Sequence, residues 1–170
     1  MKLLVLGHLC IDCMHAAGEP AGERWGGIAN AIAALGALAG PDDTLVPVCG
    51  VGTADEERFL AWLGRFPAVD PSGVIILKDA TPRIDIYARP DGLNVACAKD
   101  IAPPIPFERI RKFLSADGIL INMVSGADIE LETLDQIRME IRARGTPVHL
   151  DVHNLTTVIG PERELSLIHI

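Results

Sequence analysis

The sequence predicts an α/β protein with a doubly wound, mostly parallel sheet and helices on both faces. Short segments that are almost entirely apolar, such as 2–6 and 118–124, are typical of strands that are covered on both sides. Segments with apolar residues at helical spacing alternate with these strands along the chain. An apolar content of 49% with only 4% aromatic residues fits a core packed from Ala, Leu, Ile and Val.

Length and charge narrow the class of protein. With 170 residues the chain is long enough for one domain with its own core. A formal net charge of −8 argues against nucleic-acid or anionic-membrane partners, since both attract basic surfaces. No apolar run approaches the about 20 residues of a membrane span, and the first one is too short for a signal peptide. We therefore expect a cytoplasmic protein.

The first part of the chain is expected to supply two strands and a helix. Residues 2–6 form the first strand and residues 28–38 form the first helix. Between them, residues 18–22 contain two glycines and a proline and predict a flexible loop. Residues 44–49 form the second strand, which a turn at Gly50-Val51-Gly52 closes.

A second helix is predicted to begin at Thr53, because Thr53 and Glu56 have the spacing of a capping box. Its buried face is expected to consist of Phe59, Leu60 and Leu63. The preceding Gly50-x-Gly52 lacks the third glycine of a dinucleotide fingerprint, and the acidic first turn would repel a pyrophosphate. A nucleotide-binding oxidoreductase is therefore disfavoured.

A β-hairpin interrupts the alternation of strands and helices. After an apolar strand at 73–77, residues 83–88 alternate polar and apolar side chains, residues 89–92 make a turn, and residues 93–98 return. Such a hairpin has one wet face and is expected to stand outside the buried sheet as a lid or an interface. The proline-rich segment 102–106 is the link back.

The last part of the chain returns to the buried pattern. Residues 107–114 predict a short helix, 118–124 a strand, 129–143 a helix that Gly145 stops, and 147–152 a strand. Four residues are expected on the buried face of the second of these helices: Leu131, Leu134, Ile137 and Ile141.

A candidate binding site lies at the start of the first helix. Gly26 and Gly27 would let a ligand approach the backbone, and the helix would present free N–H groups to it. Asn30 offers a donor and an acceptor to a polyol. Asp12, just past the first strand, lies where open α/β sheets carry ligand-binding groups. The alternatives are an ordinary glycine turn and a solvated loop aspartate.

Cysteine and histidine residues raise the question of a metal site. Cys10 and Cys13 form a C-x-x-C motif with His8 and His15 beside it, and His149 and His153 are close in sequence. Zinc knuckles normally have turn residues in such a motif, whereas here it lies in an apolar run. A thioredoxin-like motif would precede a helix, and none is expected here. Strand packing is therefore favoured, and no metal site is assigned.

These segments together resemble the ribokinase (PfkB) family of carbohydrate and nucleoside kinases, from the first strand to about Thr157. Six ordered motifs carry the resemblance: Gly7-x-x-x-x-Asp12, Gly26-Gly27-x-x-Asn30, Val48-x-Gly50-x-Gly52-x-x-Asp55, Val69-Asp70-x-Ser72-Gly73-Val74, Thr81 before the hairpin, and Leu150-Asp151. The sequence departs from the family pattern at Ile28, Ile32 and Ala39, which leaves the sugar type open.

The resemblance implies ATP-dependent phosphorylation of a hydroxyl of a sugar, polyol or nucleoside, with Mg2+ as the metal. By the same resemblance, Asp12, Gly26, Gly27 and Asn30 would hold the acceptor. The lid would exclude water and could also pair two subunits in a homodimer. Asp151 would lie near the cleft, although a strand-end turn residue explains it equally well.

Two motifs of the family do not occur in this sequence. Neither the Asn-x-x-Glu motif nor the Asp-Thr-x-Gly-Ala-Gly-Asp motif, which supplies the anion hole and the catalytic base, follows Asp151. No catalytic residue is therefore assigned, and a non-catalytic binding or interaction module of the same fold stays open.

We interpret residues 1–164 as the N-terminal part of a truncated ribokinase-like domain, with lid strands near 8–25 and 83–98. Residues 165–170 match the translation of a sequencing adapter and are interpreted as a non-native tail. A genuine short strand is the alternative for this segment.

Overall fold

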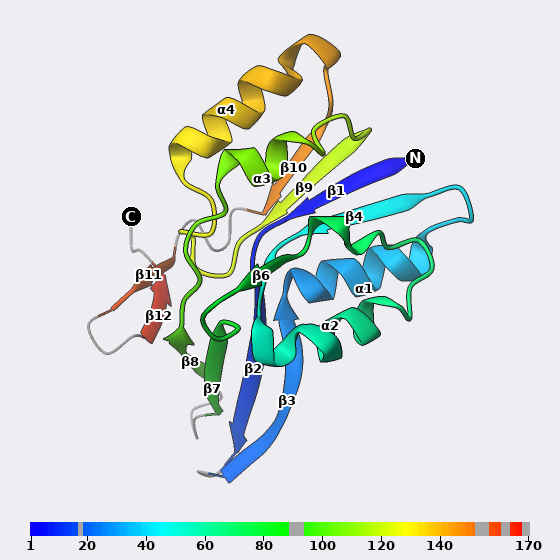
Figure 1. The fold of residues 1–170 in the computed structure, drawn as a ribbon. Coiled ribbons are helices and arrows are strands. Elements are labelled where there is room, and N and C mark those ends of the chain that lie inside the picture. The colour runs from blue at the N-terminus through cyan, green and yellow to red at the C-terminus, as the bar shows by residue number, and fades with distance from the viewer. Residues whose placement is uncertain (17–18, 89–93, 152–156, 161–163, 168–170) are drawn as a thin grey trace.

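The computed structural model describes residues 1–16, 19–88, 94–151, 157–160 and 164–167. Within these ranges the strands form a central parallel sheet, a second larger sheet and a pair of short strands. In Figure 1, α3 and α4 lie on one side of the central sheet, and α1 and α2 lie on the other. This arrangement confirms the predicted α/β architecture.

The core sheet has the strand order β10-β9-β1-β4, with all described neighbours parallel. Its strands are β1 (Lys2–Leu6), β4 (Thr44–Val48), β9 (Gly118–Asn122) and β10 (Val148–Asp151). The helices are α1 (Ile28–Leu38), α2 (Glu56–Leu63), α3 (Phe107–Arg111) and α4 (Leu131–Ile141).

Side chains of the core sheet alternate between two apolar layers. Leu4 and Leu6 pack into the layer that α3 and α4 cover, whereas Val5 packs into the layer that α1 and α2 cover. All three are fully buried. A strand buried on both faces needs an apolar run, which residues 3–6 supply, and this explains why β1 was predictable from the sequence.

The lid sheet has the strand order β11-β12-β8-β7-β2-β3 among the described residues. Its strands are β2 (Leu9–Ala16), β3 (Glu19–Gly27), β7 (Arg83–Ala88), β8 (Asn94–Asp100), β11 (Thr157–Ile159) and β12 (Glu164–Leu167). The predicted hairpin is β7–β8, and β7 joins β2 in parallel. The predicted turn at 89–92 lies outside the described residues.

The prediction of a loop at 18–22 is wrong, because Glu19–Gly22 belong to β3. Pairing with β2, including a register shift between Met14 and His15, overrides the local breaker signals. Pro20 is tolerated because β3 is the outermost strand of the lid sheet. Gly18 lies outside the described residues.

The predicted capping box at Thr53 is also wrong. Thr53–Asp55 form a 3-10 turn, α2 begins at Glu56, and the Thr53 hydroxyl donates to the Leu77 carbonyl at 3.0 Å. Gly50–Gly52 form strand β5, which pairs in parallel with β6 (Ile75–Leu77) instead of making a simple turn.

Several predicted elements are shorter than expected. Pro71–Gly73 form a 3-10 turn before β6, α3 ends at Arg111, and α4 passes into a 3-10 turn at Arg142–Arg144. Gly145 then adopts a φ of 63°, as expected for a helix stop.

Three side chains differ from the predicted burial. Leu60 and Leu131 are 37% and 75% exposed, because α2 and α4 turn these positions away from the sheet. Asp85, expected on the wet face of the hairpin, is only 7% exposed. Its carboxylate binds His15 at 3.0 Å and Lys99 at 3.1 Å, which compensates its burial.

Residues 164–167, most of which belong to the segment interpreted as a non-native tail, form β12. This strand pairs antiparallel with β8 and β11. The origin of the tail stays a prediction. No helix in the described part of the chain is long and apolar enough to cross a membrane.

Candidate acceptor-binding cleft

An open cleft of about 380 Å³ lies between the lid sheet and the carboxyl ends of β9 and β10. Ten described residues line it: Cys10, Asp12, Gly27, Asn30, Ala31, Ile84, Ile86, Asn122, Val124 and Asp151. The cleft thus joins three of the four predicted site residues. The fourth, Gly26, lies directly behind Asp12.

Asp12 lies within β2 and is only 8% exposed, so the alternative of a solvated loop aspartate is wrong. On the neighbouring strand β3, Arg24 lies opposite Asp12 and Gly26 lies opposite Cys10. A Cβ atom on Gly26 would lie 2.3 Å from Asp12 Oδ1. Glycine at position 26 therefore makes room for the carboxylate rather than for a ligand.

Two neighbours hold the Asp12 carboxylate in place. The Cys10 thiol donates to Oδ1 at 3.3 Å, and Arg24 Nε lies 3.4 Å from Oδ2. Burial, followed by the nearby Asp12 charge, raises the pKa of the Cys10 thiol far above its usual range. Cys10 therefore stays protonated and acts as a donor.

Gly27 allows the tight turn from β3 into α1. Its φ is 59°, and a Cβ atom there would lie 2.4 Å from the His8 carbonyl oxygen. The Ile28 amide donates to that oxygen at 3.2 Å, so the first helical N–H does not face the cleft. Asn30 is exposed, lines the cleft and has no hydrogen-bond partner among the described residues.

The opposite wall carries a pair of polar side chains, Asn122 and Asp151, of which the sequence analysis identified only Asp151. Asn122 ends β9, Asp151 ends the neighbouring β10, and Asn122 Nδ2 donates to Asp151 Oδ2 at 2.7 Å. A polar residue at the carboxyl end of a buried parallel strand was the signal for Asn122. His153 lies outside the described residues.

Aliphatic side chains complete the cleft. Ile84 and Ile86 of the lid sheet face Val124, which follows β9. A ligand in this cleft would meet hydroxyl-binding groups at two ends and apolar contacts between them. This combination suits a ring with hydroxyls on its edge and C–H groups on its faces.

Asp55 and Thr81, which belong to the motifs of the family resemblance, lie outside the cleft. Asp55 accepts from the Thr81 hydroxyl at 2.7 Å and pairs with Arg58 at 2.9 Å. The Gly52 amide donates to the Thr81 oxygen at 3.0 Å. Asp55 and Thr81 therefore stabilise the crossing into β7.

The C-x-x-C motif belongs to a strand, as predicted. Cys10 and Cys13 are buried free thiols on β2. No three His, Cys, Asp or Glu side chains gather as a metal site within the described ranges.

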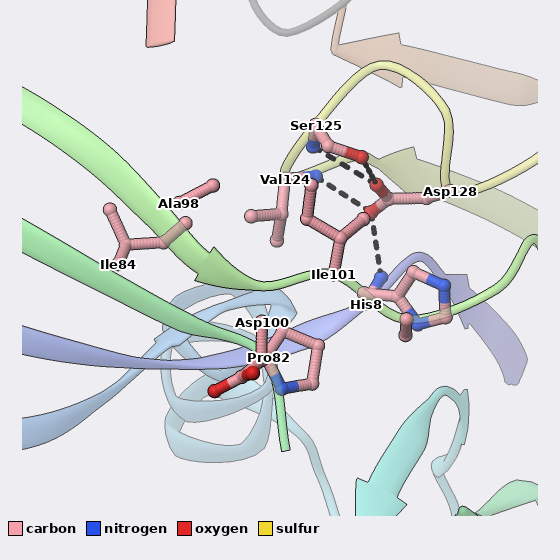
Figure 2. Close-up of a pocket in the computed structure, with 10 residues that line it drawn as sticks. His8, Pro82, Ile84, Ala98, Asp100, Ile101, Val124, Ser125 and Asp128 are labelled. Atoms are coloured by element: carbon pink, nitrogen blue, oxygen red, sulfur yellow. Dashed lines mark hydrogen bonds between the residues drawn. The ribbon is translucent and has the colours of Figure 1, made fainter. Parts of the chain in front are cut away.

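His8 lies at the base of the lid and is 3% exposed. Figure 2 shows it beside a small pocket whose wall also includes Pro82, Ile101 and Asp128. The Pro103 carbonyl lies 3.0 Å from Nε2, so Nε2 carries the proton. Nδ1 is then an acceptor with no partner among the described atoms. Burial lowers the pKa of His8, against a smaller opposing effect of Asp128.

This lowered pKa predicts acid sensitivity. The unfolded chain takes up a proton at His8 near pH 6.5, whereas the folded chain resists it. The free energy of unfolding should therefore fall as the pH drops from about 7, by at most ~1.4 kcal/mol per pH unit. In a His8→Gln variant, the free energy of unfolding should fall less over the same pH range. Urea denaturation at several pH values measures this difference. Identical pH dependence in both proteins would contradict it.

No family model and no curated protein matches the sequence. Solved structures do match. One is a pyrophosphate-dependent kinase in the ribokinase family complexed with a pyrophosphate analogue and myo-inositol, with 17% identity and a TM-score of 0.77. The match covers 97% of this chain and 54% of that one.

Two further structures agree. An uncharacterized sugar kinase from Pyrococcus horikoshii has a TM-score of 0.71 at 16% identity, over 90% of this chain and 53% of that one. The 2-dehydro-3-deoxygluconokinase of Thermotoga maritima has a TM-score of 0.69 at 15% identity, over 90% and 51%. This chain thus spans about half the length of these structures, and over that half it has the ribokinase-like α/β fold with its lid.

Proposed function

We propose that this chain carries the acceptor-binding half of a ribokinase-family kinase that phosphorylates a hydroxyl of a sugar, polyol or nucleoside. The cleft carries the proposal, since it brings Asp12, Asn30, Asn122 and Asp151 around one space. Sugar and inositol kinases among the solved structures with this fold support it. A cytoplasmic location is part of the proposal, and the four free thiols support it.

Each polar group of the cleft has a role in this proposal. The Asp12 carboxylate accepts hydrogen bonds from two neighbouring hydroxyls, and Asn30 both donates and accepts. Asn122 and Asp151 fix the opposite edge of the acceptor. The lid strands keep water from the acceptor hydroxyl, whose orientation is the main requirement of phosphoryl transfer.

The phosphoryl donor is the less defined part of the proposal. The family resemblance implies ATP with Mg2+, whereas one solved structure with this fold is described as pyrophosphate-dependent. No three His, Cys, Asp or Glu side chains of the described residues lie close enough together to hold a metal ion. The proposal therefore gives these residues no part in binding Mg2+ or the phosphoryl donor. The second candidate is a non-catalytic binding module of the same fold, which would need only the cleft.

A homodimer that pairs through the lid is also part of the proposal. Sedimentation measures the mass of the particle in solution and would distinguish this homodimer from a monomer.

Binding without turnover is the expected behaviour of the 170-residue chain. We expect myo-inositol, D-ribose, D-fructose or adenosine to shift the NMR signals of Gly27 and the side-chain amides of Asn30 and Asn122. With ATP and Mg2+ or with pyrophosphate, no product should exceed the no-enzyme control. Shifts confined to other surfaces would refute the acceptor site, and turnover would refute the assignment of the catalytic groups to a missing part.

A further inference from the structure

The lid sheet is joined to the core at four crossings of the described chain, and hydrogen bonds of His8 and Asp128 connect three of them. The crossings are Gly7-His8, Gly27-Ile28, 78–82 and 101–106. Asp128, in the loop after β9, is 1% exposed, and it binds the first crossing through its side chain and the fourth through its backbone carbonyl.

The Asp128 carboxylate accepts four hydrogen bonds, from groups that Figure 2 shows around it. Oδ2 accepts from the amides of His8 at 2.9 Å and Val124 at 2.7 Å. Oδ1 accepts from the Ser125 amide at 3.0 Å and the Ser125 hydroxyl at 2.7 Å. These bonds join the start of lid strand β2 to the end of core strand β9.

His8 and the Asp128 backbone extend the connection to the other two crossings. The His8 carbonyl accepts from the Ile28 amide at 3.2 Å, which holds the return of β3 into α1. His8 Nε2 donates to the Pro103 carbonyl, and the Asp128 carbonyl accepts from the Ile105 amide at 2.8 Å. The link from β8 to α3 is therefore held at the same point.

Apolar packing does not secure this junction by itself. Val124 packs against Ile84 and Ala98 of the lid, and a small pocket lined by these three residues, Pro82 and Ser125 lies beside this contact (Figure 2). The hydrogen bonds to Asp128 add directional contacts to this packing and so restrict the angle between lid and core. That angle places Asp12, four residues after His8, across the cleft from Asn122 and Asp151.

We infer that Asp128 is a positioning residue that locks the base of the lid onto the core and so sets the width of the acceptor cleft. Its effect on acceptor binding rests on the proposed function, whereas its effect on the lid does not. A carboxylate that accepts backbone amides without water competition suits this role, because its charge strengthens each bond.

Amide hydrogen exchange of the whole 170-residue chain tests the inference. In Asp128→Asn, one oxygen becomes a donor that faces amide donors. We expect exchange at His8, Leu9, Ile11 and Ile28 to accelerate by about tenfold to a hundredfold. Core-sheet amides should change less than about twofold. A merely structural role would accelerate all slowly exchanging amides by one common factor.

Asp117→Asn is the matched control. Asp117 Oδ2 also accepts a backbone amide, from Lys2 at 2.7 Å, but at the other end of β1. It should leave exchange in the lid unchanged. If Asp128→Asn does not fold, Ser125→Ala removes one of the four bonds and should give the same pattern with a smaller acceleration.

A titration with myo-inositol separates the two claims. We expect Asp128→Asn to weaken its binding by about tenfold. If the unchanged chain does not bind myo-inositol or the other probes, the proposed function fails and exchange alone decides the role of Asp128. Uniform acceleration of exchange, or acceleration equal to that of Asp117→Asn, would overturn the inference.

Discussion

A Gly7→Ala variant is expected to be strongly destabilised. Gly7 has a φ of 141°, and a Cβ atom would lie 1.7 Å from the Asn122 carbonyl oxygen and 2.8 Å from Ile28. Neither neighbour can retreat easily, because Asn122 ends β9 and Ile28 begins α1. Backbone strain and overpacking together should cost about 3–5 kcal/mol, which is a large part of the stability of a typical domain.

Gly22→Ala separates strain from overpacking. Gly22 has nearly the same φ, 140°, and a Cβ atom there would meet nothing within 4 Å. We expect this variant to lose only about 1–2 kcal/mol from strain. Urea denaturation followed by circular dichroism measures both variants. Equal losses of stability would show that the contact with Asn122 is not what requires glycine at position 7.

The elements predicted with correct bounds are those whose own sequence pattern identifies them, without knowledge of the strand that they pair with. β1 (Lys2–Leu6), α1 (Ile28–Leu38) and β7 (Arg83–Ala88) were predicted to the residue. An apolar run ended by glycine, a long small-residue helix and a strictly alternating segment carry their signal locally. β3 could not be predicted in the same way, because its Gly and Pro residues are held by pairing with β2.

The cleft shows the same division. Asp12, Gly27 and Asn30 were found because motif spacing points to them, whereas Asn122 was counted only as part of a strand. Asp128 occurs in a Ser-Gly-Ala-Asp sequence that is typical of a solvated turn. One of its donors, the His8 amide, is 120 residues away in the chain. No local pattern contains that information.

Removal of the Asp12 carboxylate should have the largest effect on acceptor binding. A hydrogen bond to a charged group contributes roughly 1.5–3 kcal/mol, and Asp12 is proposed to accept two. In Asp12→Ala, the dissociation constant of the polyol that binds best should therefore rise at least about tenfold, since each 1.4 kcal/mol is one decade. Asn30→Ala should weaken binding less, because Asn30 has no charge.

Asp55→Ala is the control for loss of an aspartate near the lid. Asp55 holds Thr81 and Arg58 outside the cleft, so its loss should lower the thermal midpoint and leave the dissociation constant unchanged. Calorimetric titration and thermal unfolding of the three variants give both quantities. If Asp12→Ala binds the polyol as tightly as the unchanged chain while Asp55→Ala binds it more weakly, the placement of the acceptor beside Asp12 is wrong.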